Sequence, residues 1–189
     1  FVGTFERCEA CRHLYPNNSP DGPYLYENRD VLPRAYTVQE GILVVGDGRN
    51  DAMYQLMLHP AFNPATAVAV VADTVDAPFL NRFSVVIVNG GVDEDTLTLL
   101  SQYKEQGGII YPDIFAGEQR VSSEAIGAIL DSFDTPYSEA AFVRSSPNEI
   151  TVEVAEPGFL VLSEKFYLFE GWQNEHSLMR GNGVQSVLL

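Results

Sequence analysis

The chain has 189 residues, of which 46% are hydrophobic and 20% are charged, so it can bury a core without support from disulfides or metals. Its formal net charge of −15 would repel phosphate backbones, and this argues against nucleic acid as a partner. Lys104 and Lys165 are its only lysines. Such an acidic, lysine-poor surface is typical of proteins from high salt, although acidic domains of other organisms share it.

No run of about 18 apolar residues is present, and the first five residues do not resemble a signal peptide. The chain begins without Met and ends on the apolar run 184–189. We therefore expect it to be a segment of a longer protein.

Residues 1–40 are rich in Pro, Asn, Gly and Tyr, which favour turns, so they are predicted to form an extended arm without regular elements. This arm is expected to pack on the C-terminal part of the chain. Cys8 and Cys11 form a C-x-x-C pair, but no strand–helix context and no further ligands at zinc spacing accompany them. A local disulfide or two free thiols is the favoured interpretation, and no metal site is predicted.

From residue 41 onward, short apolar runs alternate with longer helical patterns. Unbroken runs rich in Val and Ile are typical of parallel strands that are buried on both faces. The expected strands are 42–45, 67–72, 84–88 and 108–111, and the expected helices are 51–58, 93–106 and 122–133. The third helix begins with a serine cap and has apolar residues on one face.

After Pro136 the apolar residues recur with a period of two, which is typical of antiparallel strands. The expected strands are 141–144, 149–154, 158–163 and 184–189. The predicted fold class is therefore α/β: a doubly wound parallel sheet, amidotransferase- or flavodoxin-like, with a smaller antiparallel part formed by the C-terminal strands and the N-terminal arm. The predicted domains are an arm over 1–40, an α/β layer over 41–136 and an antiparallel β part over 137–189.

Ligands of open parallel sheets gather beyond the carboxyl ends of the strands. The polar residues expected there are Asp47, Arg49, Asp73, Asn89 and Asp113, and they are the candidate ligand-binding set. Three interpretations of them stay open. They could cap the helices that follow. Arg49, Asn89 and Asp113 could bind a sugar-like small molecule, or the three aspartates could hold a divalent metal for a hydrolase or transferase.

The segment Gly46-Asp47-Gly48-Arg49-Asn50-Asp51 lies between a predicted strand and a predicted helix, where backbone amides could hold an anion. A dinucleotide-binding fingerprint needs a third glycine, and Asp51 occupies that position with a negative charge. Nucleotide binding is therefore disfavoured, and no cofactor is predicted.

The run 83–91, followed by a helix and by Gly107-Gly108-Ile109-Ile110-Tyr111, resembles the glutamine amidotransferase-like fold. In that family a nucleophilic cysteine occupies a tight turn after a strand. The corresponding turn here reads Tyr111-Pro112-Asp113-Ile114-Phe115 and has neither Cys nor Ser. Because no side chain in this turn can be activated as a thiolate or alkoxide, amidotransferase hydrolysis is excluded and no catalytic residue is predicted.

Tyr24-Leu25-Tyr26-Glu27-Asn28 and Leu32-Pro33-Arg34-Ala35-Tyr36 carry a further resemblance. They are similar to the "YEN…LPRAY" segment in the extracytoplasmic region of the YfhO-type family of multi-pass membrane proteins. Residues 157–164, reading PGFLVLSE, followed by Gly171-Trp172, are similar to its "LVLSE…YPGW" segment, and Arg180-Gly181-Asn182 falls where the family has an "RAN" strand. The chain departs from this pattern by extra residues before Gly171.

This resemblance implies a non-catalytic domain on the extracytoplasmic side of the cell membrane, with the α/β layer inserted between two β-rich halves. Its partner would be the membrane-embedded, glycosyltransferase-like remainder of the same chain, which it supports or to which it presents ligand, with a saccharide or lipid-linked sugar as the implied small molecule. The expected alternatives are the metal-dependent enzyme and the sugar-binding domain described above.

Overall fold

The computed structural model describes residues 11–15, 25–28, 31–72, 74–118, 122–146, 149–162, 178–180 and 186–188. The chain divides into two compact units, residues 1–32 and residues 33–189, which are described separately.

The first unit contains an antiparallel pair of strands, β1 (Cys11–Tyr15) and β2 (Leu25–Asn28). The expectation that residues 1–40 lack regular elements is therefore wrong. The Pro- and Asn-rich stretch 16–23 lies between the two strands, so turn-forming residues there do not prevent pairing on either side. Cys8 lies outside the described residues.

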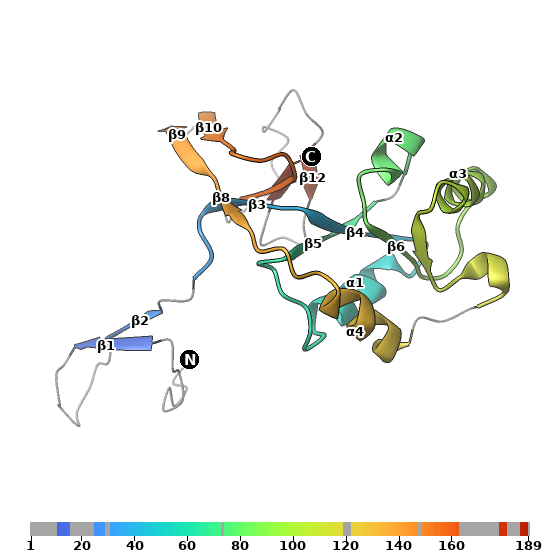
Figure 1. Cartoon of the computed structure of the whole chain (residues 1–189), viewed down its shortest axis with the longest axis horizontal. Coiled ribbons are helices and arrows are strands. Elements are labelled where there is room, and N and C mark those ends of the chain that lie inside the picture. Colours follow the sequence, from blue (N-terminus) through green and yellow to red (C-terminus); the bar gives the residue numbers. More distant parts are fainter. Residues whose placement is uncertain are drawn as a thin grey trace. The chain divides into compact units, whose positions relative to one another are not determined.

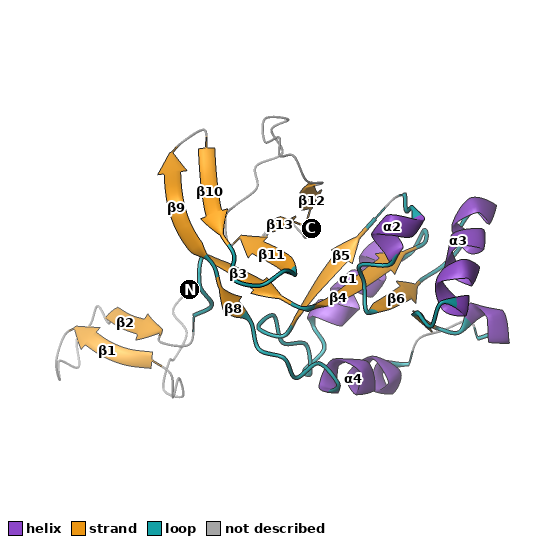
Figure 2. Ribbon diagram, turned by 45° about the horizontal axis from the view of Figure 1, so that its top comes forward, coloured by secondary structure: helices purple, strands orange, loops and turns teal. Residues whose placement is uncertain are grey.

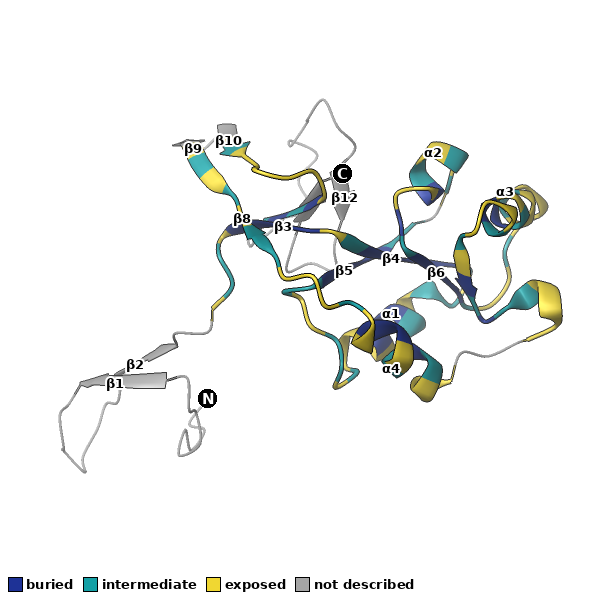
Figure 3. Ribbon diagram, in the orientation of Figure 1, coloured by how far each residue is buried: buried dark blue, intermediate teal, exposed yellow. Residues whose placement is uncertain are grey.

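The centre of the second unit is a parallel four-stranded sheet, as predicted. Its strands lie in the order β5-β4-β6-β7, with bounds Ala67–Val71, Glu40–Val45, Val85–Val88 and Ile109–Tyr111. All three neighbouring pairs are parallel. Strands β4, β5 and β6 are mostly dark blue in Figure 3, because helices cover both of their faces, whereas β7 is only partly buried.

Helices cover the two faces of this sheet (Figure 1). On one face α1 (Arg49–Met57) and α4 (Ser123–Asp131) share a core with Ile42, Val44 and Val85. The other face is covered by α3 (Glu94–Glu105) and a short α2 (Ala77–Leu80), which was not predicted because one turn is too short to show periodicity. No described helix is long and apolar enough to cross a membrane.

A second, antiparallel sheet has the strand order β12-β13-β11-β3-β8. The bounds are Leu178–Arg180, Ser186–Leu188, Phe159–Leu162, Ala35–Val38 and Ser138–Glu139. Two further strands, β9 (Ala141–Ser146) and β10 (Glu149–Glu153), form a hairpin and lie side by side in Figure 2. The predicted periodicity thus located β9, β10, β11 and β13, but the short strands β8 and β12 were not predicted.

The two sheets of this unit are joined at β3 and β4, which are separated only by Gln39. Beside this junction the ring of Phe159, from β11, packs against Phe83 with ring centroids 5.3 Å apart. The same ring occupies the space that a side chain at Gly41 would need. Phe159 is 3% exposed and so links the antiparallel sheet to the α/β layer.

Candidate functional site

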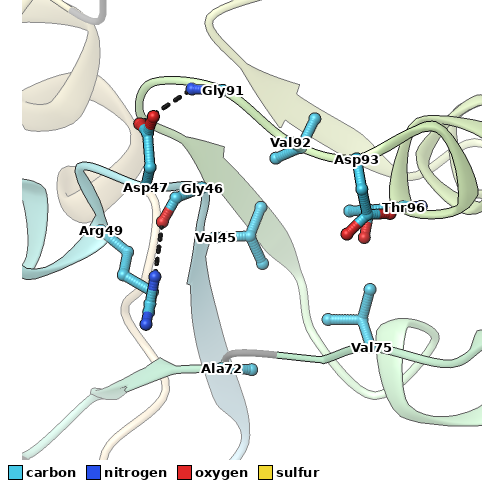
Figure 4. Close-up of a pocket in the computed structure, with 10 residues that line it drawn as sticks. All are labelled: Val45, Gly46, Asp47, Arg49, Ala72, Val75, Gly91, Val92, Asp93 and Thr96. Carbon is cyan, nitrogen blue, oxygen red and sulfur yellow. Dashed lines mark hydrogen bonds between the residues drawn. The ribbon is translucent and has the colours of Figure 1, made fainter.

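The strand order places a topological switch point between β4 and β6, because the chain leaves these neighbours toward opposite edges of the sheet. The loops at their carboxyl ends are residues 46–48 and 89–91. An open cleft of about 210 Å³ lies beside them (Figure 4). Its lining residues are Val45, Gly46, Asp47, Arg49, Ala72, Val75, Gly91, Val92, Asp93 and Thr96.

The two switch-point loops are joined by four hydrogen bonds. The Asp47 backbone N–H donates to the Gly91 carbonyl at 3.0 Å, and the Gly91 N–H donates back to Asp47 Oδ1 at 2.9 Å. The Gly48 N–H donates to the Asn89 carbonyl at 2.9 Å, and Asn89 Nδ2 donates to the Gly48 carbonyl at 2.7 Å. Asp47 and Asn89 therefore fasten one loop to the other.

This close approach depends on two glycines. Gly46 has φ +100°, and a Cβ at this position would point at the Asn89 carbonyl. Gly90 has φ +84°, and a Cβ there would point at the Asp47 carboxylate. An added Cβ at either position would both strain the backbone and collide with the opposite loop. Gly46, which belongs to the segment considered for anion binding, thus serves loop-to-loop packing.

The walls of the cleft combine apolar and polar groups. Val45, Val75 and Val92 provide apolar surface, and in Figure 4 their side chains lie between the two polar sides. On one side Arg49 Nη1 donates to the Gly46 carbonyl at 3.0 Å. On the other, Asp93 caps α3 and its Oδ1 accepts from the Thr96 N–H at 2.7 Å.

Hydrogen bonds from Thr96 lower the pKa of Asp93, so this carboxylate is ionised over the physiological range. The cleft consequently offers carboxylate acceptors from Asp47 and Asp93 and a guanidinium donor from Arg49. Asp93 and Thr96 were not among the predicted site residues. Their signal was the Asp-x-x-Thr spacing after Gly90-Gly91, which marks a helix N-cap but not a site.

Asp113 has a different environment at the end of β7. Lys104 Nζ lies 2.6 Å from both of its carboxylate oxygens, and Oδ1 also accepts from the Ala116 N–H at 3.1 Å. The hydrogen bond from Lys104, followed by smaller contributions from its charge and from backbone amides, lowers the pKa of Asp113. The turn after β7 therefore holds an ion pair between Lys104 and Asp113.

The structure thus brings together three of the five predicted residues, Asp47, Arg49 and Asn89, around the switch point. Asp113 lies two strands away from β4, about 10 Å at the usual strand spacing. Asp73 lies outside the described residues. Within the described part of the chain, no group of three His, Cys, Asp or Glu side chains is placed to hold a metal ion.

Fold and site together define a mixed α/β protein with a parallel four-stranded sheet, antiparallel sheets and a cleft at the switch point. No family model, curated protein or solved structure matches the chain.

Proposed function

We propose that this chain is a non-catalytic extracytoplasmic domain of a multi-pass membrane protein and supports a glycosyltransferase-like membrane body. The observation that carries the proposal is the pairing of β3 with β11, in the register Ala35 to Leu162 and Val38 to Phe159. These strands belong to the two segments, far apart in the sequence, that resemble the YfhO-type family. Two segments of one ancestral β domain would be expected to pair in this way.

The position of the α/β layer in the sequence supports its interpretation as an insertion. β3 pairs on its other side with β8, in the register Tyr36 to Glu139 and Thr37 to Ser138. The whole α/β layer lies between these two strands in the sequence. Because the strands are paired, the first and last residues of the layer lie close together in space. An insertion that preserves a host sheet needs such adjacent ends.

The contacts of the strand-end residues support a non-catalytic role. Asp47 and Asn89 fasten the switch-point loops, and Asp113 is paired with Lys104. These contacts give each of the three side chains a structural role within the protein.

Cysteine accessibility in the full-length protein tests the proposed setting. With Cys8 and Cys11 replaced by Ser, a cysteine at the exposed Glu105 should react with a membrane-impermeant maleimide in intact cells. The matched control Leu43→Cys, at a position with 0% exposure, should react only after denaturation. Labelling of Glu105→Cys only after lysis, or a full-length reading frame without flanking hydrophobic spans, would contradict the proposal.

A second candidate function is binding of a small saccharide at the switch-point cleft. It is favoured by the pairing of apolar walls with both donor and acceptor groups, since sugars present C–H faces and hydroxyls together. In a thermal-shift screen of saccharides, a binder should stabilise the wild type but not Val92→Trp, which fills the cleft. A flat screen would remove this candidate and leave the supporting role untouched.

A metal-dependent reaction has less support, because Asp113 is held by a lysine ammonium and lies away from Asp47. Calorimetry with magnesium, calcium and manganese tests it directly. Heat that disappears in Asp47→Asn would revive the metal hypothesis.

A further inference from the structure

A second cavity lies at the opposite end of the parallel sheet, near the amino ends of its strands. It has a volume of about 380 Å³, within the range of small-molecule sites. α4 packs over β4 and the inner part of this face and leaves β7 partly uncovered. Ile109, the first residue of β7, is 48% exposed as a result.

One wall of this cavity is apolar and partly aromatic. Val85 and Ile109 line it from the sheet, and Ile129 and Phe133 line it from α4 and the residues after it. Tyr111 adds a second aromatic side chain. Such a wall suits the hydrocarbon or aromatic body of a ligand, and aromatic faces also attract cations.

The polar end of the cavity is negative. Glu40 contributes a carboxylate that also accepts a hydrogen bond from Ser84 Oγ at 2.5 Å. Ser132, the C-cap of α4, brings the helix C-terminus to the same cavity, and this end of a helix carries partial negative charge. The last turn of α4 has no basic residue, and none lines the cavity.

We propose that this cavity binds a small organic cation, a primary or substituted ammonium carried on an apolar or aromatic body. The ammonium would donate to the Glu40 carboxylate and lie near the carbonyl end of α4, while the body would pack against Ile109 and Phe133. The carboxylate comes from β4, Tyr111 from β7, and the helix terminus and Phe133 from the end of α4 and the residues after it, and all of these groups favour a positive charge. This site is separate from the switch-point cleft and does not depend on the proposed function.

Three ligands of nearly equal shape separate charge from hydrophobicity: 2-phenylethylammonium, neutral 2-phenylethanol and anionic 3-phenylpropionate. Each is titrated into the ¹⁵N-labelled full chain at physiological ionic strength, and amide shifts of Ile109, Ile129 and Phe133 are followed. The ammonium should bind with a Kd about tenfold below that of the alcohol, as one charge-assisted hydrogen bond would give. The carboxylate should not bind.

Two variants and one control make the assignment specific. Glu40→Gln keeps an acceptor for Ser84 but removes the charge, so the ammonium should lose its advantage over the alcohol. Ala128→Phe, at an exposed position of α4 that lines the cavity, should abolish binding of both ligands. Glu105→Gln, which removes an equal charge from the end of α3, should change nothing.

Three outcomes would overturn the proposal. The first is equal affinity for ammonium and alcohol in the wild type. The second is an ammonium preference that survives Glu40→Gln, which would mean attraction by the net negative charge of the whole protein. The third is the absence of shifts at these amides up to the solubility limit of the ligands.

Discussion

At the residue scale, Phe159 makes a buried contact between the two sheets. Gly41→Ala would place a methyl group where the buried ring lies, so it should lower the free energy of unfolding by about 1–3 kcal/mol. In a Phe159→Leu background the same substitution should cost clearly less, because the ring is gone. Urea denaturation of the two single variants and the double variant measures this coupling, and additive effects would show that the ring does not fill the space beside Gly41.

Tyr103 makes a buried hydrogen bond that connects α3 to the loop before β6. Its hydroxyl donates to the Phe83 carbonyl at 2.9 Å. Tyr103→Phe leaves this carbonyl without its donor and should cost about 1–3 kcal/mol in unfolding free energy. The control Tyr54→Phe, at a side chain that is 66% exposed, should change stability by less than about 0.5 kcal/mol.

Burial raises the pKa of Tyr103, and a backbone hydrogen bond at Ile109 only partly offsets this. Because the folded pKa lies above the unfolded value near 10, the contribution to stability is complete below pH 10 and is lost as pH rises through the folded value. The wild type should therefore lose stability above pH 10 more steeply than Tyr103→Phe. Parallel slopes for the two proteins in denaturation at alkaline pH would contradict the burial of this hydroxyl.

The Lys104–Asp113 pair gives a prediction at acid pH. Lys104 lowers the folded pKa of Asp113 below the ordinary 3.8, so its stabilising effect is present above that value and is lost as pH falls through the folded pKa. Lys104→Met should raise the pKa of the Asp113 carboxyl toward 3.8 in a ¹³C NMR titration. An unchanged titration curve would mean that the ion pair does not form in solution.

At the element scale, the start of α4 depends on one cap. Ser122 Oγ accepts from the Ala125 N–H at 3.0 Å, and His59 Nε2 lies 3.1 Å from the Ser123 carbonyl in the same turn. Ser122→Ala should cost about 1 kcal/mol, whereas Ser123→Ala, one residue later and without the cap, should cost little. Equal melting temperatures for the two variants in calorimetry would show that the cap does not contribute.

Elements with strong local patterns were predictable from the sequence. The Val- and Ile-rich runs identified β4–β7, and period-two segments identified β9–β11 and β13. The strands β8 and β12 are two and three residues long, and their existence depends on partners distant in the sequence. β3 was not predicted for the same reason, since its partners β8 and β11 follow about 100 and about 120 residues later.

The candidate site was only partly predictable. Strand ends located Asp47, Arg49 and Asn89 at the sheet edge, because the carboxyl ends of parallel strands share one edge. The sequence could not show that Asp47 and Asn89 each form a hydrogen bond with the opposite loop of the switch point. Nor could it show that Lys104 pairs with Asp113, because all these contacts depend on how the strands and helices pack. The cavity beneath α4 depends on how far this helix extends across the sheet, and no local pattern determines that.

At the scale of the whole molecule, we propose that the α/β layer is an insertion in a β3–β8 hairpin. The register Thr37 to Ser138 makes Val38 and Tyr137 the next facing pair, so a two-residue turn could join them. To test this, residues 39–136 are replaced by Asn-Gly in a shortened chain. This deletion would expose the ring of Phe159, so Phe159→Thr is introduced into both the intact and the shortened chain.

The decisive measurement is the pattern of interstrand NOEs in these two proteins. The claim predicts that the shortened chain keeps the pairing of Tyr36 with Glu139 and of Val161 with Tyr36, at the same positions as the intact chain. Loss of these NOEs in the shortened chain, while the intact Phe159→Thr protein retains them, would show that the antiparallel sheet requires the α/β layer and would contradict the insertion.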